Sequence, residues 1–177
     1  MSFIGDVTKG EVFNAGNFLA NGDENIVRET REASASSALV VTGEDGSKHI
    51  PAGTAYPSND GNAIGLMYED VDVTNGNMPC SVITKNAVVY EDRLAITGES
   101  YDAVTPVGTE NPSEEEWYER SGSAGSYVYT LTTDTTVQSG TTYYAKSDVR
   151  LASSAKTALQ ALGFKFIATA PAVTRPY

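Results

Sequence analysis

The stretch Ile64–Leu94, IGLMYEDVDVTNGNMPCSVITKNAVVYEDRL, decides the fold. An apolar run opens it, and residues 71–74 then alternate apolar with polar, which is the period of a half-buried strand. Asn75-Gly76 is a turn signal, because both residue types tolerate the positive φ of tight turns. A second apolar run, residues 80–89, resumes the strand pattern and ends at an acidic corner. The stretch predicts two strands with a turn-rich connection, and no catalytic pattern.

The size and charge of the chain set the next limits. Its 177 residues suit one domain with an insertion and can bury a core. The 12 basic and 23 acidic residues give a net charge of −11. Nucleic-acid binders neutralise phosphates with Lys and Arg, so we expect no nucleic acid among the partners. No apolar run approaches the roughly 20 residues of a membrane span, so we expect no membrane either.

Residues 1–37 are expected to form an N-terminal arm. Apolar side chains are scattered there among Gly and Asn without a helix or strand period: Phe3, Ile4, Val7, Phe13 and Phe18. Two interpretations stay open, namely a mobile terminus and a segment that orders on a partner surface. The first residues lack a basic region followed by an apolar run, so we expect no signal peptide and folding in a cytoplasm.

The remaining sequence predicts a mainly β fold. Short apolar runs separated by Gly, Asn and Asp turns indicate a small β-barrel or sandwich-like domain, built from residues 38–106 and 147–170. One C-terminal helix is expected, with its apolar residues on one face: Ala155, Ala158, Leu159 and Leu162. Ser153 or Ser154 can cap it and Gly163 can end it. A last strand follows, and residues 171–177 are expected to be an extended tail.

Residues 107–146 read as an insertion into this domain. An acidic block precedes a Ser/Gly tip at 121–126, and a Tyr/Thr-rich run follows it. The flanking runs 117–120 and 127–131 predict an inserted β-hairpin module around that tip. The phrase W-Y-E…Y-T-L-T-T-D-T-T-V-x-x-G-x-T-Y-Y resembles a small β module of structural proteins from phages of Gram-positive hosts.

The sequence offers little catalytic chemistry. His49 and Cys80 are the sole residues of their types, so Ser-His-Asp, Cys-His and multi-His metal arrangements lack members. Cys80 is expected to be a buried small apolar residue. The segment from Asp70 misses the glycine and glutamate positions of an EF-hand loop. A carboxylate pair for glycoside hydrolysis stays open, because its separation is spatial. We therefore expect this protein to have no enzymatic activity and to bind no metal and no cofactor.

The motif order within residues 64–94 resembles tailed-phage head-decoration proteins, including the lambda-type decoration and head-fibre families. Ile50-Pro51-Ala52-Gly53-Thr54 is similar to their V/I-P-A-G-T strand motif, and residues 156–166 are similar to their terminal helix and strand. The resemblance implies a virion protein on the capsid exterior. Its implied partners are the major capsid protein and further copies of itself, as a homotrimer. The long arm and the insertion depart from the smallest members.

Three classes of function remain open. A capsid decoration protein would use the arm residues Phe3, Ile4, Val7, Phe13 and Phe18 as capsid contacts. Its insertion would present an outward-facing ligand surface of aromatic residues: Trp117, Tyr118, Tyr127, Tyr129 and Tyr143. A tail, baseplate or fibre accessory protein is the alternative, although a long fibre would need repeats or heptads. A small hydrolase or sugar-binding enzyme is the least supported.

Overall fold

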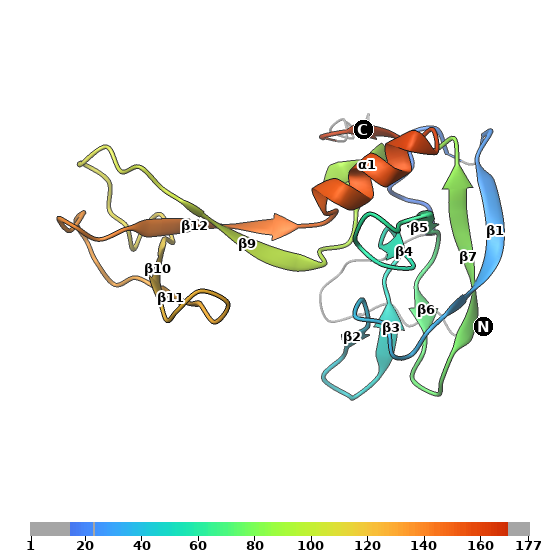
Figure 1. The fold of residues 1–177 in the computed structure, drawn as a ribbon, viewed down its shortest axis with the longest axis horizontal. Coiled ribbons are helices and arrows are strands. Elements are labelled where there is room, and N and C mark those ends of the chain that lie inside the picture. Colours follow the sequence, from blue (N-terminus) through green and yellow to red (C-terminus); the bar gives the residue numbers. More distant parts are fainter. Residues whose placement is uncertain (1–14, 23, 170–177) are drawn as a thin grey trace, which may run out of the picture. The chain divides into compact units, whose positions relative to one another are not determined.

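The computed structural model describes residues 15–22 and 24–169, which fold into two compact units (Figure 1). Unit 1 comprises Met1–Thr97 with Arg150–Tyr177, and unit 2 comprises Gly98–Val149. Strands dominate the described residues, and their one α-helix, α1 (Ser153–Ala161), belongs to unit 1. The predicted mainly β fold with a C-terminal helix is confirmed.

Unit 1 is built from three small sheets. An antiparallel four-stranded sheet has the order β1-β7-β5-β4, a three-stranded sheet has the order β2-β3-β6, and β13 pairs in parallel with β8. The strands are β1 (Val27–Ala33), β2 (Val41–Thr42), β3 (Lys48–Ile50), β4 (Ala55–Tyr56), β5 (Gly65–Met67), β6 (Val71–Asp72), β7 (Met78–Lys85), β8 (Val88–Tyr90) and β13 (Lys165–Ile167), and a 3₁₀ turn, η1 (Glu91–Arg93), follows β8. None of the described sheets closes into a barrel, so the domain is sandwich-like.

The stretch 64–94 forms four short strands, β5 to β8, rather than the two predicted. Asn75-Gly76 does make a turn, in which the Gly76 N–H donates to Val73 O at 3.2 Å. Gly76 adopts φ +123°, but Asn75 does not adopt a positive φ. The turn joins β6 to β7, which lie in different sheets, so it is a link between layers and not a hairpin.

Two apolar clusters form the core of unit 1. The larger cluster gathers residues from the N-terminal segment, β5, β7, β8 and α1: Phe18, Leu19, Ala52, Ala55, Ala63, Leu66, Ile83, Ala87, Val89, Leu94, Ala155, Leu159 and Phe164. The smaller cluster lies around β3, β6 and β7: Ala33, Ile50, Met67, Val71, Val73, Cys80 and Val82. Gly65 lies so close to β7 that any Cβ there would collide with the Ile83 carbonyl oxygen.

The predicted arm 1–37 is wrong for the part that the structure describes. Phe18 is 0% exposed in the larger core cluster, and Leu19 forms a bridge to Val89 of β8. Backbone hydrogen bonds fix this segment, from Ala20 N–H to Val88 O at 2.7 Å and from Tyr90 N–H to Phe18 O at 2.8 Å. Phe18 is therefore a core residue and is not available as a capsid contact.

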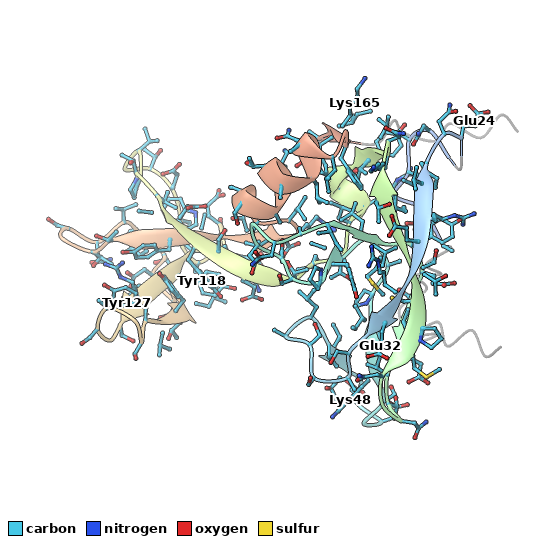
Figure 2. The ribbon with its side chains drawn as sticks, turned by 45° about the vertical axis from the view of Figure 1, so that its right-hand side comes forward. Glu24, Glu32, Lys48, Tyr118, Tyr127 and Lys165 are labelled. Atoms are coloured by element: carbon cyan, nitrogen blue, oxygen red, sulfur yellow. The ribbon has the colours of Figure 1, made fainter. Side chains whose placement is uncertain are left out.

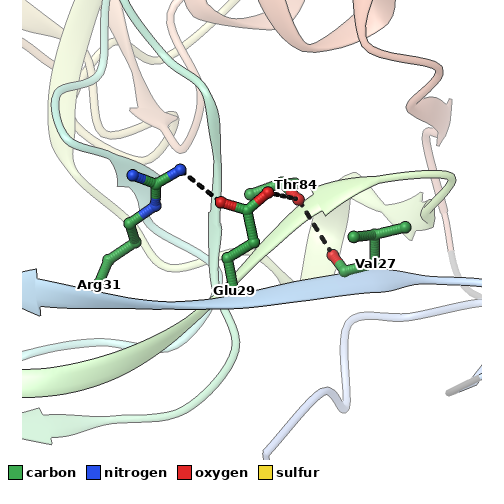
Figure 3. A network of polar contacts seen from close by, with 4 residues as sticks. All are labelled: Val27, Glu29, Arg31 and Thr84. Atoms are coloured by element: carbon green, nitrogen blue, oxygen red, sulfur yellow. Dashed lines mark hydrogen bonds and ion pairs between the residues drawn. The ribbon is translucent and has the colours of Figure 1, made fainter.

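The predicted arm also contains β1, which pairs with β7 along its whole length. Apart from Val27, its exposed side chains are polar, and some of them interact locally. Glu29 pairs with Arg31, and Thr84 Oγ1 lies 3.2 Å from Glu29 Oε1 and 3.4 Å from Val27 O (Figure 3). The polar composition that suggested an arm or linker belongs instead to the exposed edge of a sheet.

Helix α1 differs from its prediction at the start and agrees with it at the end. The N-cap is Ala152, without a side-chain hydrogen bond, so the prediction of a serine cap is wrong. Gly163 ends the helix region with φ +89°, as predicted. Ala155 and Leu159 are buried, and residues 164–167 alternate inward and outward as the predicted last strand.

A polar network joins the two chain segments at which unit 1 is interrupted. Asn59 Nδ2 donates to Thr97 Oγ1 at 2.8 Å and to Arg150 O at 3.3 Å. Asn59 Oδ1 accepts from the Ala152 N–H at 2.8 Å. Thr97 Oγ1 donates to Arg150 O at 3.0 Å, and the Arg150 guanidinium donates to Leu94 O. One side chain thereby ties the end of the first segment to the start of the second.

Unit 2 is one antiparallel sheet in the order β11-β10-β12-β9. Its strands are β9 (Gly98–Ala103), β10 (Tyr118–Ser121), β11 (Val128–Leu131) and β12 (Tyr143–Val149). The predicted hairpin around the 121–126 tip is β10 and β11. The unit is wider than the predicted insertion 107–146, because β9 pairs with β12 from Gly98 to Ala103.

Candidate functional site

The predicted capsid contacts do not form a described site. Phe3, Ile4, Val7 and Phe13 lie outside the described residues, and Phe18 is in the core. The other predicted site, the aromatic surface of unit 2, is described completely.

The register of the unit 2 sheet sorts its aromatic residues onto two faces. Tyr118 pairs with Tyr144, and Arg120 pairs with Tyr129, so these side chains share one face. We call this the tyrosine face. Glu119 pairs with both Tyr143 and Thr130, which places those three on the opposite face, the acidic face. The five residues predicted to form one surface are therefore divided.

The acidic face buries two of the predicted ligand residues. Tyr143 is 0% exposed and Trp117 is 6% exposed, with ring centroids 5.6 Å apart. The Tyr143 hydroxyl donates to Asp134 Oδ2 at 2.6 Å and accepts from the Gln138 N–H at 3.1 Å. Burial, and then the hydrogen bond to Asp134, raise the pKa of Tyr143. Both rings are core residues of unit 2, so their prediction as outward-facing is wrong.

The tyrosine face is a packed aromatic cluster. Tyr101 and Tyr129 are stacked, with centroids 4.0 Å apart and an interplanar angle of 4°. Tyr118 and Tyr101 form an edge-to-face pair with centroids 5.2 Å apart, and Tyr144 and Tyr129 form another at 5.3 Å. Stacked and edge-to-face pairs are the favourable ring geometries. Because the rings pack against one another, Tyr118 and Tyr129 are only half-exposed.

Tyr127 is the most exposed of the predicted aromatic residues, at 43%. The Arg120 guanidinium lies over its ring at 4.3 Å and over the Tyr144 ring at 4.9 Å, both cation–π distances. Tyr118 and Tyr127 are labelled in unit 2 in Figure 2. Tyr127 is thus the one predicted ligand residue with substantial free surface.

Sequence reasoning missed Tyr101, Arg120 and Tyr144. A usable signal was present for Tyr144, because consecutive residues of a strand point to opposite faces. If Tyr143 lies on one face, Tyr144 must lie on the other. Tyr101 lies outside the predicted insertion 107–146, so the sequence gives no signal that groups it with these residues.

A shallow depression of about 390 Å³ lies in unit 2, lined by Glu115, Glu116, Tyr118, Ala145, Lys146 and Asp148. Lys146 Nζ lies 2.5 Å from Glu99 Oε1, and the Tyr101 hydroxyl donates to Glu99 Oε2 at 2.8 Å. The hydrogen bonds from Lys146 and Tyr101 lower the pKa of Glu99, and the same bond to Glu99 raises the pKa of Lys146. These groups are solvent-exposed, which screens their interaction.

The metal and membrane findings concern residues 15–22 and 24–169. In this part of the chain, no three His, Cys, Asp or Glu side chains are grouped to hold a metal ion. Cys80 is buried, as predicted, and its burial raises the pKa of its thiol. His49 is half-buried in β3, opposite Asp72. No helix in the same part is long and apolar enough to cross a membrane.

Comparisons with known proteins give no assignment: no family model, no curated protein and no solved structure matches this chain. The sequence motifs and their positions in the fold are therefore what bears on function.

Proposed function

We propose that this protein is a head-decoration protein of a tailed phage. It binds the outer surface of the expanded capsid as a homotrimer and stabilises the shell by bridging major capsid subunits. The observation that carries the proposal is that three separate segments with the family resemblance, residues 50–54, 64–94 and 156–166, assemble in one unit. The segment without a counterpart in small decoration proteins folds as the other unit.

Specific contacts join the three segments. The Gly53 N–H donates to Met67 O at 2.8 Å, which ties the first segment to the second. Leu94 ends the second segment and belongs to the same buried cluster as Leu159 and Phe164 of the third. Lys156 Nζ lies 2.7 Å from Glu91 Oε1, a further link between the second and third segments. Motifs that assemble this way support a shared domain more strongly than motifs scattered along a chain.

The proposed capsid contacts are Phe3, Ile4, Val7 and Phe13. Their apolar side chains have no regular period, as suits a segment that lies over a partner surface. The described chain that follows is fixed to the core, where the Gly16 N–H donates to Tyr68 O at 2.9 Å. Any binding segment would therefore end close to residue 15, and not at residue 37.

Co-sedimentation with undecorated heads, expanded and unexpanded, tests the proposal. The full chain is expected to bind expanded heads saturably and to leave unexpanded heads free. A variant lacking residues 2–14 is expected to lose binding and to keep its fold, because the deletion stops before Phe18 and Leu19. The variant Val41→Ala/Ile64→Ala alters exposed apolar residues elsewhere in unit 1 and serves as the matched control. If the full chain binds neither expanded nor unexpanded heads, or binds purified tails instead, the proposal is overturned.

A further inference from the structure

Strand β11 is an unprotected edge of the unit 2 sheet. It pairs with β10 on one side and ends the strand order on the other. The described chain has three edge strands of four residues or more: β1, β9 and β11. Strands β1 and β9 contain charged side chains, whereas β11 (Val128-Tyr129-Thr130-Leu131) contains none. Charged residues and prolines are the usual protection against pairing with another chain.

The backbone of β11 has free hydrogen-bonding groups at this edge. In an antiparallel pair, every second residue of a strand bonds to its neighbour. The Thr132 N–H donates to Trp117 O at 2.9 Å, so this bond shows which residues of β11 face β10. Thr130 and Val128 continue that alternation and bond to β10. Tyr129 and Leu131 therefore direct their N–H and C=O groups outward. Val128 and Leu131 are also 59% and 49% exposed, so the edge is apolar as well as unpaired.

The two faces beside this edge differ in charge. Glu119 lies on the acidic face next to Thr130, and Asp134 lies close to Tyr143 on the same face. Among the described residues, neither carboxylate takes part in an ion pair. The tyrosine face, which includes the side chains of Tyr129 and Leu131, is formed mainly by aromatic rings. Unit 2 as a whole has nine acidic residues and two basic ones.

We propose that β11 binds a basic, extended polypeptide segment, which adds as a further strand to the unit 2 sheet. The segment alternates lysine or arginine, facing Glu119, with apolar residues, facing Tyr129 and Leu131. An added strand lies roughly 9–10 Å from β10, a gap that lysine and glutamate side chains together span. Backbone bonds supply affinity in such strand addition, and alternate side chains supply specificity. The proposal rests on unit 2 alone and does not depend on the capsid function.

Charge favours this occupant over a second copy of the chain. Pairing β11 with β11 of another copy would bring two strongly acidic units together, and like charges at an interface oppose association. The electrostatic interaction of a basic segment with unit 2 is attractive, and it is strongest at low ionic strength. Binding should therefore weaken as salt is raised.

Fluorescence anisotropy with labelled ten-residue peptides tests the proposal. A peptide alternating lysine with valine is expected to bind the full-length protein at least tenfold more tightly than a peptide alternating glutamate with valine. A scrambled peptide of the same lysine and valine content should bind at least fivefold more weakly, because it loses the separation of faces. Equal binding of the alternating and scrambled lysine peptides would overturn strand addition.

Backbone methylation of the peptide tests the hydrogen bonding directly. One series carries N-methyl groups on the valines and the other on the lysines. Only the residues that bond to Tyr129 and Leu131 are sensitive, so the loss should be confined to one series. These are the valines for an antiparallel strand and the lysines for a parallel strand. Equal loss in both series, or no loss in either, would overturn the proposal.

Protein variants locate the binding edge. Leu131→Lys adds a charge to the edge and is expected to weaken binding at least tenfold. Val107→Lys changes an 80% exposed valine in the same unit, outside the strands, and should leave affinity within twofold. Glu119→Gln keeps an acceptor for the Thr132 hydroxyl but should weaken binding and reduce its salt dependence. A self-associated species in sedimentation velocity that Leu131→Lys abolishes would overturn the choice of occupant.

Discussion

Asn59→Ala is expected to lower the free energy of unfolding of unit 1 by about 2–3 kcal/mol. The half-buried Asn59 amide makes three hydrogen bonds, to Thr97, Arg150 and Ala152. A typical hydrogen bond contributes about 1 kcal/mol net, and a part-buried group left without a partner costs about 1–3 kcal/mol. The Ala152 N–H is such a group, because Asn59 Oδ1 is the acceptor at the helix N-cap. The substitution also removes the link between the two segments of unit 1.

Urea unfolding followed by two probes measures this effect. Circular dichroism at 222 nm reports α1 together with the strands of both units, whereas the fluorescence of Trp117, the one tryptophan, reports unit 2 alone. The part of the circular dichroism transition that the Trp117 fluorescence does not follow should move to lower urea without a change of slope. Asn75→Ala, an exposed turn residue, is the matched control and should stay within about 0.5 kcal/mol of the parent. A shift for Asn59→Ala no larger than that of the control would refute the reasoning.

Three further substitutions test other parts of the fold. Gly65→Ala should unfold unit 1 or reduce its soluble yield severely, because the new Cβ meets the Ile83 carbonyl oxygen; unchanged circular dichroism would contradict the close approach. Leu159→Ala should cost about 3–5 kcal/mol in urea unfolding, since Leu159 is 0% exposed; a loss under about 1 kcal/mol would contradict its place in the core. Tyr143 has a raised pKa when folded, so the native state keeps its proton longer and stability should fall as pH rises above about 10. Tyr143→Phe should flatten that fall in the Trp117 transition, and an unchanged slope would contradict it.

Local patterns predicted the local parts of the structure. Alternation identified the last strand, where Phe164 just before it and Phe166 within it turn inward between exposed residues. The Ser/Gly tip identified the β10–β11 hairpin, whose register is set by neighbours in sequence. Gly163 identified the helix end, because a left-handed residue commonly closes a helix. Each of these features is determined within about ten residues of chain.

Non-local pairing accounts for the main errors. Residues 15–22 have no period, and several of their hydrogen bonds go to residues far along the chain, such as Gly16 to Tyr68 and Ala20 to Val88. Phe18 is buried by that distant partner, which no local pattern reveals. Strand β1 has the composition of a polar linker because, of its seven side chains, only that of Ala33 is buried. Sequence patterning detects a buried face, and a strand whose side chains are mostly exposed presents none.

The aromatic residues of unit 2 show how composition constrains a site. The unit has no cluster of aliphatic residues among its buried side chains, which are Pro112, Trp117, Thr132, Tyr143 and Tyr144. A small domain buries little surface and needs apolar contacts in its core. In unit 2 the aromatic rings supply these contacts. Removing a tyrosine that packs against Tyr101 or Tyr129 is expected to loosen the sheet. Substitutions that test ligand binding are therefore best made at the exposed edge. At Leu131 an added charge is expected to weaken peptide binding and to leave the core unchanged.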